Sequence, residues 1–495
     1  MEKYNNDNSY RHTLKYTSIF GSVQGLNILM GLVRNKLVAL LLGPAGMGLI
    51  SLYNSTTTLI SNGTSFGLSM SGVKNVSEEF DSGVSSTRLR ETVKLIRSLS
   101  VIFAVFGTLL CLLLCRQLSM WTFDDDSHTW DFAALSPMIG MMAINTGELA
   151  IMKGVRMLKQ IAKVSVFNVA AAVVVSIPLF YYYGMRGIIP SFLLLTTVQT
   201  VFTLYNSCQR FPLRLSFSRR VLRRGNTMLR LGIAFLLASV FGSGTEFVIR
   251  LYLNNAGSLD TVGLFNAGYM ITLVYGGLVF SAMETDYFPR LSSIGANDVE
   301  GRNDIANKQV EVSLLLISPM LTAFITFLPI IIPLLFSSKF NAVLPMVQVT
   351  VLAMYLRALK LPLAYIPLAR GDSRSYLFLE GSYAVVLIVM MYVMFSRFGL
   401  IGSGYALLAT SVIDFVIITL LVRHKYSYRI SRSTMLLAGA QLPIGVATYA
   451  ISQLTSGILY WTVCIMLSVA SLAVSLLILN RKTALLSSLR SKLRL

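Results

Sequence analysis

Five basic side chains lie inside stretches of the chain that are otherwise apolar: Arg34, Lys36, Arg250, Arg357 and Lys360. A lipid-facing cation at the middle of a bilayer costs about 2.5–3.5 kcal/mol on insertion scales. Each of these side chains must therefore face protein, water or an anion. The acids expected in the same stretches are fewer, namely Glu148, Glu246 and Asp414. This surplus of positive charge indicates a site for a negatively charged solute.

Helical geometry separates the possible roles of the first three cations. Arg34 and Lys36 are two residues apart, about 200° around a helix, so they cannot both point into one cavity. We favour Arg34 for the cavity. Glu246 and Arg250 are four residues apart and can pair on one helix face. That bridge is either purely structural or one that opens when an anionic substrate takes the arginine.

Arg357 and Lys360 are three residues apart and share a helix face. Asp414 could neutralise one of them, so both structural pairing and ligand binding stay open, with binding favoured. For Glu148 we favour a packing or capping role over proton coupling.

Glu284 and Asp286 close an apolar stretch at its expected cytoplasmic end. They are candidates for a cytoplasmic gate that latches onto basic loops, with simple solvation as the default interpretation.

The stretches that carry these residues predict an integral membrane protein. The chain has 495 residues, of which only 13% are charged, whereas soluble domains carry about 25%. A helix needs about 20 apolar residues to cross a bilayer. Fourteen stretches fit: 17–42, 47–72, 95–114, 132–152, 162–184, 187–207, 231–253, 262–284, 312–336, 344–368, 377–396, 401–422, 434–452 and 458–480.

The basic residues outside the spans predict the orientation. They gather on loops that follow even-numbered spans and on both terminal segments. The opposite side has only Arg116, Arg186, Lys339 and Arg397. By the positive-inside rule, both termini lie in the cytoplasm.

Two basic segments need no chemistry to explain them. The loop between the sixth and seventh spans serves as a topology determinant and a contact for anionic lipids; it holds Arg210, Arg214, Arg219, Arg220, Arg223, Arg224 and Arg230. The tail 484–495 alternates leucines with basic residues, which is typical of an amphipathic helix on the inner membrane surface.

An internal repeat divides the expected spans. Lys36 precedes the pair Gly48-Leu49 by 12 residues, and Arg250 precedes Gly263-Leu264 by 13. Two copies of six helices would be related by an axis along the membrane normal, with the site between them. We expect an all-α polytopic protein with an N-lobe at 1–210, a C-lobe at 211–430, and an extra helix pair with the tail at 431–495.

No residue pattern predicts catalysis, a cofactor or a metal. The four cysteines lie in or beside apolar stretches, where packing is expected, and the three histidines are scattered. Asp124, Asp125 and Asp126 alone are too weak a metal motif. Because the basic charge lies in short loops beside spans, it indicates no nucleic acid partner. Without a nucleotide-binding loop, energy must come from an ion gradient, the membrane potential or the substrate gradient.

Four short motifs, in order along the chain, carry a family resemblance: NKLVALLLGPAGMGL at 35–49, MKGVR at 152–156, YFPRLS at 287–292 and LFSSKF at 335–340. The chain resembles Wzx-type O-antigen flippases of the multidrug/oligosaccharidyl-lipid/polysaccharide (MOP) exporter superfamily. Arg34 is placed like an arginine that lines the central cavity of the related peptidoglycan-precursor flippases. The last two spans resemble the additional pair of that branch, which helps to form a groove for the lipid tail.

The resemblance implies a function and partners. The substrate would be an undecaprenyl-diphosphate-linked oligosaccharide, moved from the inner to the outer leaflet of the bacterial inner membrane by alternating access. The partners would be membrane lipids, a polysaccharide polymerase, a chain-length regulator and a coupling cation, H⁺ or Na⁺. One alternative is an ion-coupled drug or solute exporter of the same superfamily, although the first span holds bases rather than a carboxylate. A polysaccharide polymerase is disfavoured, because the longest expected external loop is short.

Overall fold

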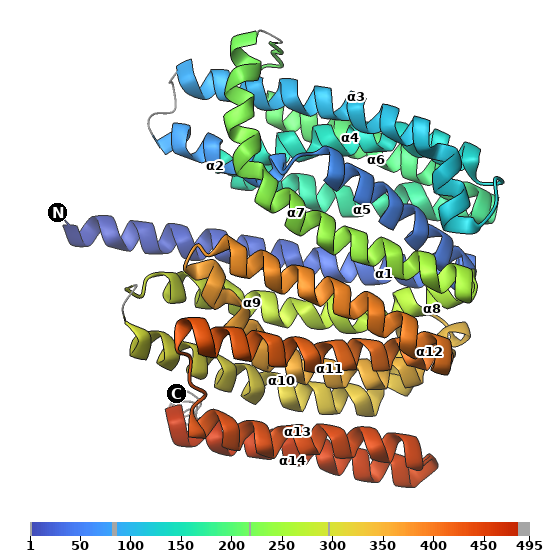
Figure 1. Ribbon diagram of the computed structural model, residues 1–495, viewed down its shortest axis with the longest axis vertical. Coiled ribbons are helices and arrows are strands. Elements are labelled where there is room, and N and C mark those ends of the chain that lie inside the picture. The colour runs from blue at the N-terminus through green and yellow to red at the C-terminus, as the bar shows by residue number, and fades with distance from the viewer. Residues whose placement is uncertain (1, 82–86, 217–218, 296–297, 484–495) are drawn as a thin grey trace. The chain divides into compact units, whose positions relative to one another are not determined.

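The computed structural model describes residues 2–81, 87–216, 219–295 and 298–483, and every regular element in these ranges is a helix. The predicted all-α class is confirmed. The elements are α1 (Glu2–Thr64), α2 (Leu68–Asp81), α3 (Thr87–Phe123), α4 (Thr129–Gly154), α5 (Leu158–Tyr183), η1 (Gly184–Gly187), α6 (Ile188–Cys208), α7 (Arg219–Ala256), α8 (Leu259–Tyr269), η2 (Met270–Tyr275), α9 (Gly276–Ser292), α10 (Val299–Leu335), η3 (Ser338–Val343), α11 (Leu344–Ala369), α12 (Ser373–Tyr426), α13 (Arg432–Leu454) and α14 (Gly457–Thr483) (Figure 1).

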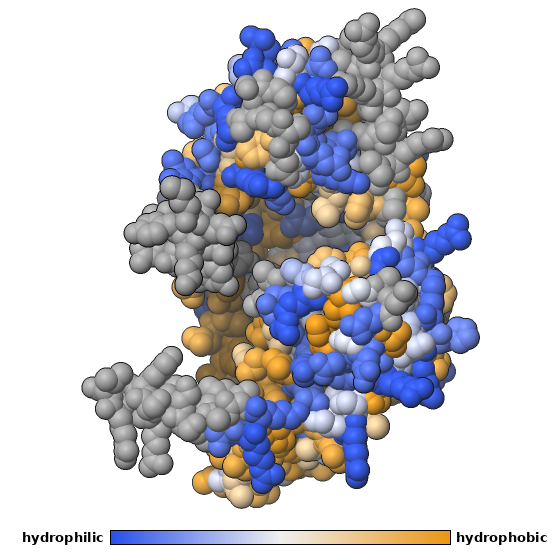
Figure 2. Space-filling model, turned by 90° about the vertical axis from the view of Figure 1, so that its left-hand side faces the viewer, coloured by the Kyte–Doolittle hydropathy of each residue, from blue (hydrophilic) through white to orange (hydrophobic). Residues whose placement is uncertain are grey.

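The helices leave large apolar side chains exposed, as a lipid-facing protein does. The most apolar window of α14 has a mean hydropathy of 2.5 but is only 17% buried. Trp130 is 82% exposed and Ile458 is 83% exposed. Hydrophilic residues instead gather over the helix ends at the left of Figure 1, which face the viewer in Figure 2. An exposed apolar surface of this kind is typical of contact with a membrane or with another protein.

Nine helical stretches among the described residues are long and apolar enough to cross a membrane. Some of them contain two predicted spans. In α1, Gly43 has φ 65°, and in α12, Gly399 has φ 60°, so each helix is in fact two helices joined across a kink. This backbone conformation favours glycine, which has no Cβ. Gly43 ends the span predicted at 17–42, and Gly399 separates those predicted at 377–396 and 401–422. The total of fourteen spans stays a prediction.

The first compact unit of the chain contains residues up to Gly263 together with Leu335–Ser337. In it α3 packs on α4, α4 on α6, and α1 on both α5 and α7. Lipid tails are as apolar as leucine, so close packing rather than water exclusion must hold such helices together. A Cβ added to Gly147 would lie 1.9 Å from Ser100 Oγ, which shows how closely α4 approaches α3.

The second unit contains Leu264–Leu334 and the residues from Ser338 onward. Here α11 packs on α12 and α13 on α14. Buried amide and hydroxyl groups join the last two helices: Gln441 Nε2 donates to Ser475 Oγ at 2.9 Å, and Ser471 Oγ donates to Gln441 Oε1 at 2.7 Å. In α10, Thr326 Oγ1 lies 3.1 Å from Ser468 Oγ of α14. The lobes at 1–210 and 211–430 and the segment 431–495 stay a prediction, and the tail 484–495 lies outside the described residues.

Two glycines singled out by the sequence repeat meet within the first unit. A Cβ on Gly48 would lie 2.0 Å from the carbonyl oxygen of Leu259, and a Cβ on Gly263 would lie 1.9 Å from that of Pro44. Each carbonyl belongs to the residue four positions before the other glycine.

This contact leads to a stability prediction. Gly48→Ala places a methyl group against a backbone carbonyl that cannot rotate away, so we expect a loss of about 1–3 kcal/mol in the free energy of unfolding. The matched control is Gly63→Ala in the same helix, where nothing lies within 4 Å of the added Cβ. Helix propensity predicts that this control is neutral or stabilising by up to about 1 kcal/mol. Denaturant unfolding of the purified chain in detergent measures both. Equal stabilities for the two variants would contradict the close contact.

Candidate substrate-binding site

Arg34 lies half-buried on α1 and contacts a neutral group of α5. Its Nε donates to Ser176 Oγ at 3.3 Å, and Ser176 in turn donates to the carbonyl oxygen of Ala172. No carboxylate of the described chain lies within ion-pair distance of Arg34. A guanidinium has five N–H donors, so most of the hydrogen-bonding capacity of Arg34 is left for a ligand. Lys36 is also half-buried, two residues further along the same helix.

Arg250 is held by its own helix and by the second half of α1. Its guanidinium donates to Glu246 Oε2 at 3.0 Å and, through Nε, to Ser51 Oγ at 2.6 Å. The side chain of Arg250 is 8% exposed, whereas that of Glu246 is 47% exposed. The predicted bridge between positions four apart is therefore formed, and its acidic partner is the more accessible one.

In the second unit, Lys360 of α11 forms an ion pair with Asp414 of α12. Their side chains are 14% and 5% exposed. The Lys360 ammonium also lies 4.7 Å from the ring centroid of Tyr383. Of the two roles considered for Lys360, the contacts are those of structural pairing.

Arg357 has no such partner and packs against an irregular helix. Its guanidinium lies 5.3 Å from the ring centroid of Phe280, and one nitrogen is 3.5 Å from the carbonyl oxygen of Leu273. Leu273 belongs to η2, a π-helical segment between α8 and α9. Such segments free backbone carbonyls and are frequent at functional sites. No carboxylate of the described residues lies within ion-pair distance of Arg357.

Glu380 is a membrane-embedded acid that the sequence analysis missed. It lies half-buried on α12, where electrostatic interactions link its carboxyl group with Tyr376, Asp414 and Lys360. It lies within the predicted span 377–396 and could have been found there. With Glu380 counted, the two cations of the second unit, Arg357 and Lys360, face two acids. Among the described embedded groups of the first unit, the three predicted cations Arg34, Lys36 and Arg250 outnumber the acid Glu246, so the surplus positive charge lies there.

Arg97 is a second embedded charge that the sequence analysis missed. It is the ion-pair partner of Glu148. The two side chains, each 3% exposed, form an ion pair in which Arg97 Nε donates to Glu148 Oε1 at 2.7 Å. Arg97 also donates to the carbonyl oxygens of Phe211 and Pro212, at 3.0 and 2.9 Å. Arg97 lies at the start of the predicted span 95–114, where it was counted with the adjacent loop. Glu148 is thus a buried partner of a cation, and its contacts are structural.

The predicted cytoplasmic gate residues differ in what can be described. The side chain of Glu284 lies outside the described residues. Asp286 pairs with Arg290, four residues along α9, at 3.0 Å, and both side chains are exposed. This local pair is not a latch onto a basic loop, and a gating role for either residue stays a prediction.

The acidic run after α3 is satisfied by its own neighbours. Asp126 pairs with Arg116 at 3.0 Å, and Asp125 accepts hydrogen bonds from the backbone and side chain of Ser127. These bonds stabilise the carboxylate and hold the pKa of Asp125 below its usual value. Among the described residues no three His, Cys, Asp or Glu side chains are placed to hold a metal ion.

The fold is similar to that of several solved membrane transporters. The lipid II flippase MurJ, in an inward closed conformation, is similar with a TM-score of 0.73 and 12% identity, over 94% of this chain and 99% of that chain. An inward-facing multidrug resistance MATE family transporter has a TM-score of 0.65 and 16% identity, over 81% and 94%. A MOP superfamily transporter from Pyrococcus furiosus has a TM-score of 0.53 and 17% identity, over 83% and 93%.

The family follows from the sequence. Residues 37–345, more than half of the chain, match the family described as polysaccharide biosynthesis protein, and the chain belongs to that family. The resemblance to Wzx-type flippases of the MOP superfamily is thereby confirmed. No curated protein matches the chain. The protein is a MOP-type lipid-linked flippase or transporter, and the family and its structural neighbours are transporters rather than enzymes.

The contacts of Glu148 predict the effect of removing its charge. Glu148→Gln leaves Arg97 buried without a counter-charge, which is expected to cost about 3–5 kcal/mol of unfolding free energy. The control is Asp304→Asn, which breaks the exposed pair with Lys308 and is expected to cost at most about 1 kcal/mol. Unfolding in detergent is again the measurement. If the Glu148→Gln protein were as stable as the wild type, Glu148 would have no structural role, and proton coupling would become the favoured interpretation.

Proposed function

We propose that this protein moves an undecaprenyl-diphosphate-linked oligosaccharide, such as an O-antigen repeat unit, from the inner to the outer leaflet of the bacterial inner membrane. Membership of the polysaccharide biosynthesis family supports this class of cargo. Both termini would lie in the cytoplasm, in keeping with the positive-inside pattern. Alternating access of the two predicted lobes, with the lipid tail left in the bilayer, belongs to the same proposal.

A diphosphate leaves water only if other donors replace its hydration. Arginine does this best, because its planar guanidinium offers two parallel N–H groups to phosphate oxygens. The contacts of four of the five predicted cations rank them for this task. Lys360 has a carboxylate partner, and so does Arg250. Among the described residues, the polar and ring contacts of Arg34 and Arg357 are with a hydroxyl, a carbonyl and an aromatic ring. We therefore propose Arg34 in the first unit and Arg357 in the second as the leading candidates for diphosphate binding, each judged by its own contacts.

The observation that supports the proposal most directly is that Arg34 and Arg357 have no carboxylate partner among the described residues. Arg250 would join when the diphosphate displaces the half-exposed Glu246, as the sequence analysis considered. Lys36 and Lys360 would contribute to the positive potential rather than to direct contacts. The polymerase, the chain-length regulator and a coupling H⁺ or Na⁺ remain proposed partners.

Complementation of a flippase-deficient strain tests the assignment. We expect Arg34→Ala and Arg357→Ala each to reduce surface polysaccharide about tenfold or more, because each removes a charge-assisted hydrogen bond to the diphosphate. The lipid-linked intermediate should accumulate on the cytoplasmic side. Arg186→Ala and Lys339→Ala are matched controls, because they remove exposed cations and should retain activity. Wild-type polysaccharide levels in both arginine variants, with normal expression, would refute the role.

A second candidate is an ion-coupled exporter of small molecules, because a multidrug resistance transporter shares the fold. A cationic drug would be attracted by net acid, whereas the first unit carries surplus base among its embedded groups. Drug resistance conferred by the chain, without any complementation of polysaccharide synthesis, would favour this candidate. Polysaccharide polymerisation remains the least favoured function.

A further inference from the structure

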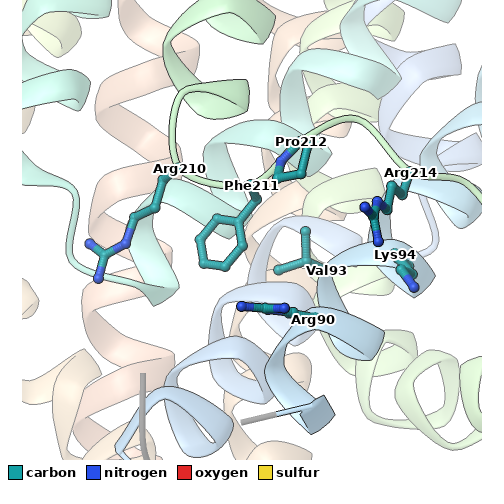
Figure 3. A pocket seen from close by; sticks show the side chains of 7 residues that line it. All are labelled: Arg90, Val93, Lys94, Arg210, Phe211, Pro212 and Arg214. Carbon is teal, nitrogen blue, oxygen red and sulfur yellow. The ribbon is translucent and has the colours of Figure 1, made fainter. Parts of the chain in front are cut away.

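A pocket of about 360 Å³ lies in the first unit, where the loop after α6 crosses the start of α3. Four basic side chains line it together with three apolar ones (Figure 3): Arg90, Lys94, Arg210, Arg214, Val93, Phe211 and Pro212. No carboxylate is among these residues. The volume lies within the range of small-molecule sites, about 300–1,000 Å³. The pocket is distinct from the cations assigned to diphosphate binding.

Buried contacts hold the loop in place, so the pocket is a fixed feature of the fold. Arg97, itself paired with Glu148, donates to the carbonyl oxygens of Phe211 and Pro212. Ser98 Oγ accepts the backbone N–H of Ser216 at 2.9 Å. These bonds tie both ends of the loop to α3.

The cations come from both sides of this crossing. Arg90 and Lys94 are four residues apart and share a face of α3, while Arg214 reaches the pocket from the loop. Figure 3 shows Lys94 and Arg214 at one edge, Arg90 beneath Val93, and Arg210 at the other edge. The guanidinium of Arg210 lies 5.6 Å from the ring centroid of Phe80. None of the four forms an ion pair with a carboxylate of the described residues.

Like charges that line one pocket repel one another, and an anion bound between them would relieve this repulsion. The apolar wall of Val93, Phe211 and Pro212 adds a surface for the neck of an amphiphile. We propose that this pocket binds a phosphate-bearing group, either the headgroup of an anionic lipid or a soluble phosphate. Each guanidinium group that lines the pocket could donate two parallel N–H groups to oxygens of the phosphate, which is the usual bidentate geometry of arginine. The site does not depend on the proposed function.

Equilibrium dialysis of the full-length protein in detergent against radiolabelled pyrophosphate tests the site. The background is Arg34→Gln with Arg357→Gln, which removes the cations assigned to the transported substrate. We expect the background protein to bind pyrophosphate saturably. Adding the double substitution Arg90→Gln with Arg214→Gln should weaken this binding about tenfold or more, because two charge-assisted contacts are lost. The charge-matched control, Arg374→Gln with Arg432→Gln, removes exposed cations of the second unit and should leave the binding unchanged.

Competition separates the two sources of phosphate. Phosphatidylglycerol that displaces pyrophosphate, when phosphatidylcholine does not, identifies a lipid headgroup; the absence of competition identifies a soluble phosphate. No saturable binding in the background protein would overturn the proposal. So would equal weakening in the pocket variant and its control, because only general positive charge would then be at work. Both results leave the flippase proposal intact, since they are obtained without Arg34 and Arg357.

Discussion

A charged side chain removed from water must find a counter-charge, enough polar contacts or a ligand. This constraint shapes the interior of both units. Arg97 and Lys360 meet it with carboxylates of another helix or helix segment, Glu148 and Asp414. Arg250 meets it with a neighbour four residues away and a serine. Arg34 and Arg357 meet it only in part, through neutral groups, and this difference is the basis of their proposed binding role.

Irregular backbone segments lie beside several of these charged side chains. Positive-φ glycines at positions 43 and 399 each join two apolar helices across a kink. The π-helical segment Met270–Tyr275 offers a carbonyl to Arg357. The same buried pair, Arg97 and Glu148, also fixes the loop that forms the basic pocket. One structural ion pair thus connects the packing of the first unit with a second candidate anion site.

Local features of the sequence predicted local features of the structure well. The Gly43-Pro44 break, the all-helical class and the pairing of Glu246 with Arg250 each depend on a few neighbouring residues. Partners distant in sequence could not be predicted, because helical periodicity does not say which helix lies beside which. Glu148 therefore had no assigned partner until Arg97 was found beside it. Asp414 could have neutralised either Arg357 or Lys360, and the sequence did not decide between them.

Charges at the ends of spans were the other source of error. Arg97 lies just inside a predicted span and was counted with the loop, and Glu380 was left out of the embedded acids. Both omissions made the positive surplus look more evenly spread than it is. The corrected balance places the surplus in the first unit, among Arg34, Lys36 and Arg250.

The most direct test of the central claim is the dissociation constant of undecaprenyl diphosphate for the purified full-length protein. The account predicts that Arg34→Gln with Arg357→Gln raises this constant about tenfold or more. Arg186→Gln with Lys339→Gln, which removes the same charge from exposed positions, should leave it unchanged. An undiminished affinity in the Arg34 and Arg357 variant would show that arginines without carboxylate partners are not the diphosphate ligands.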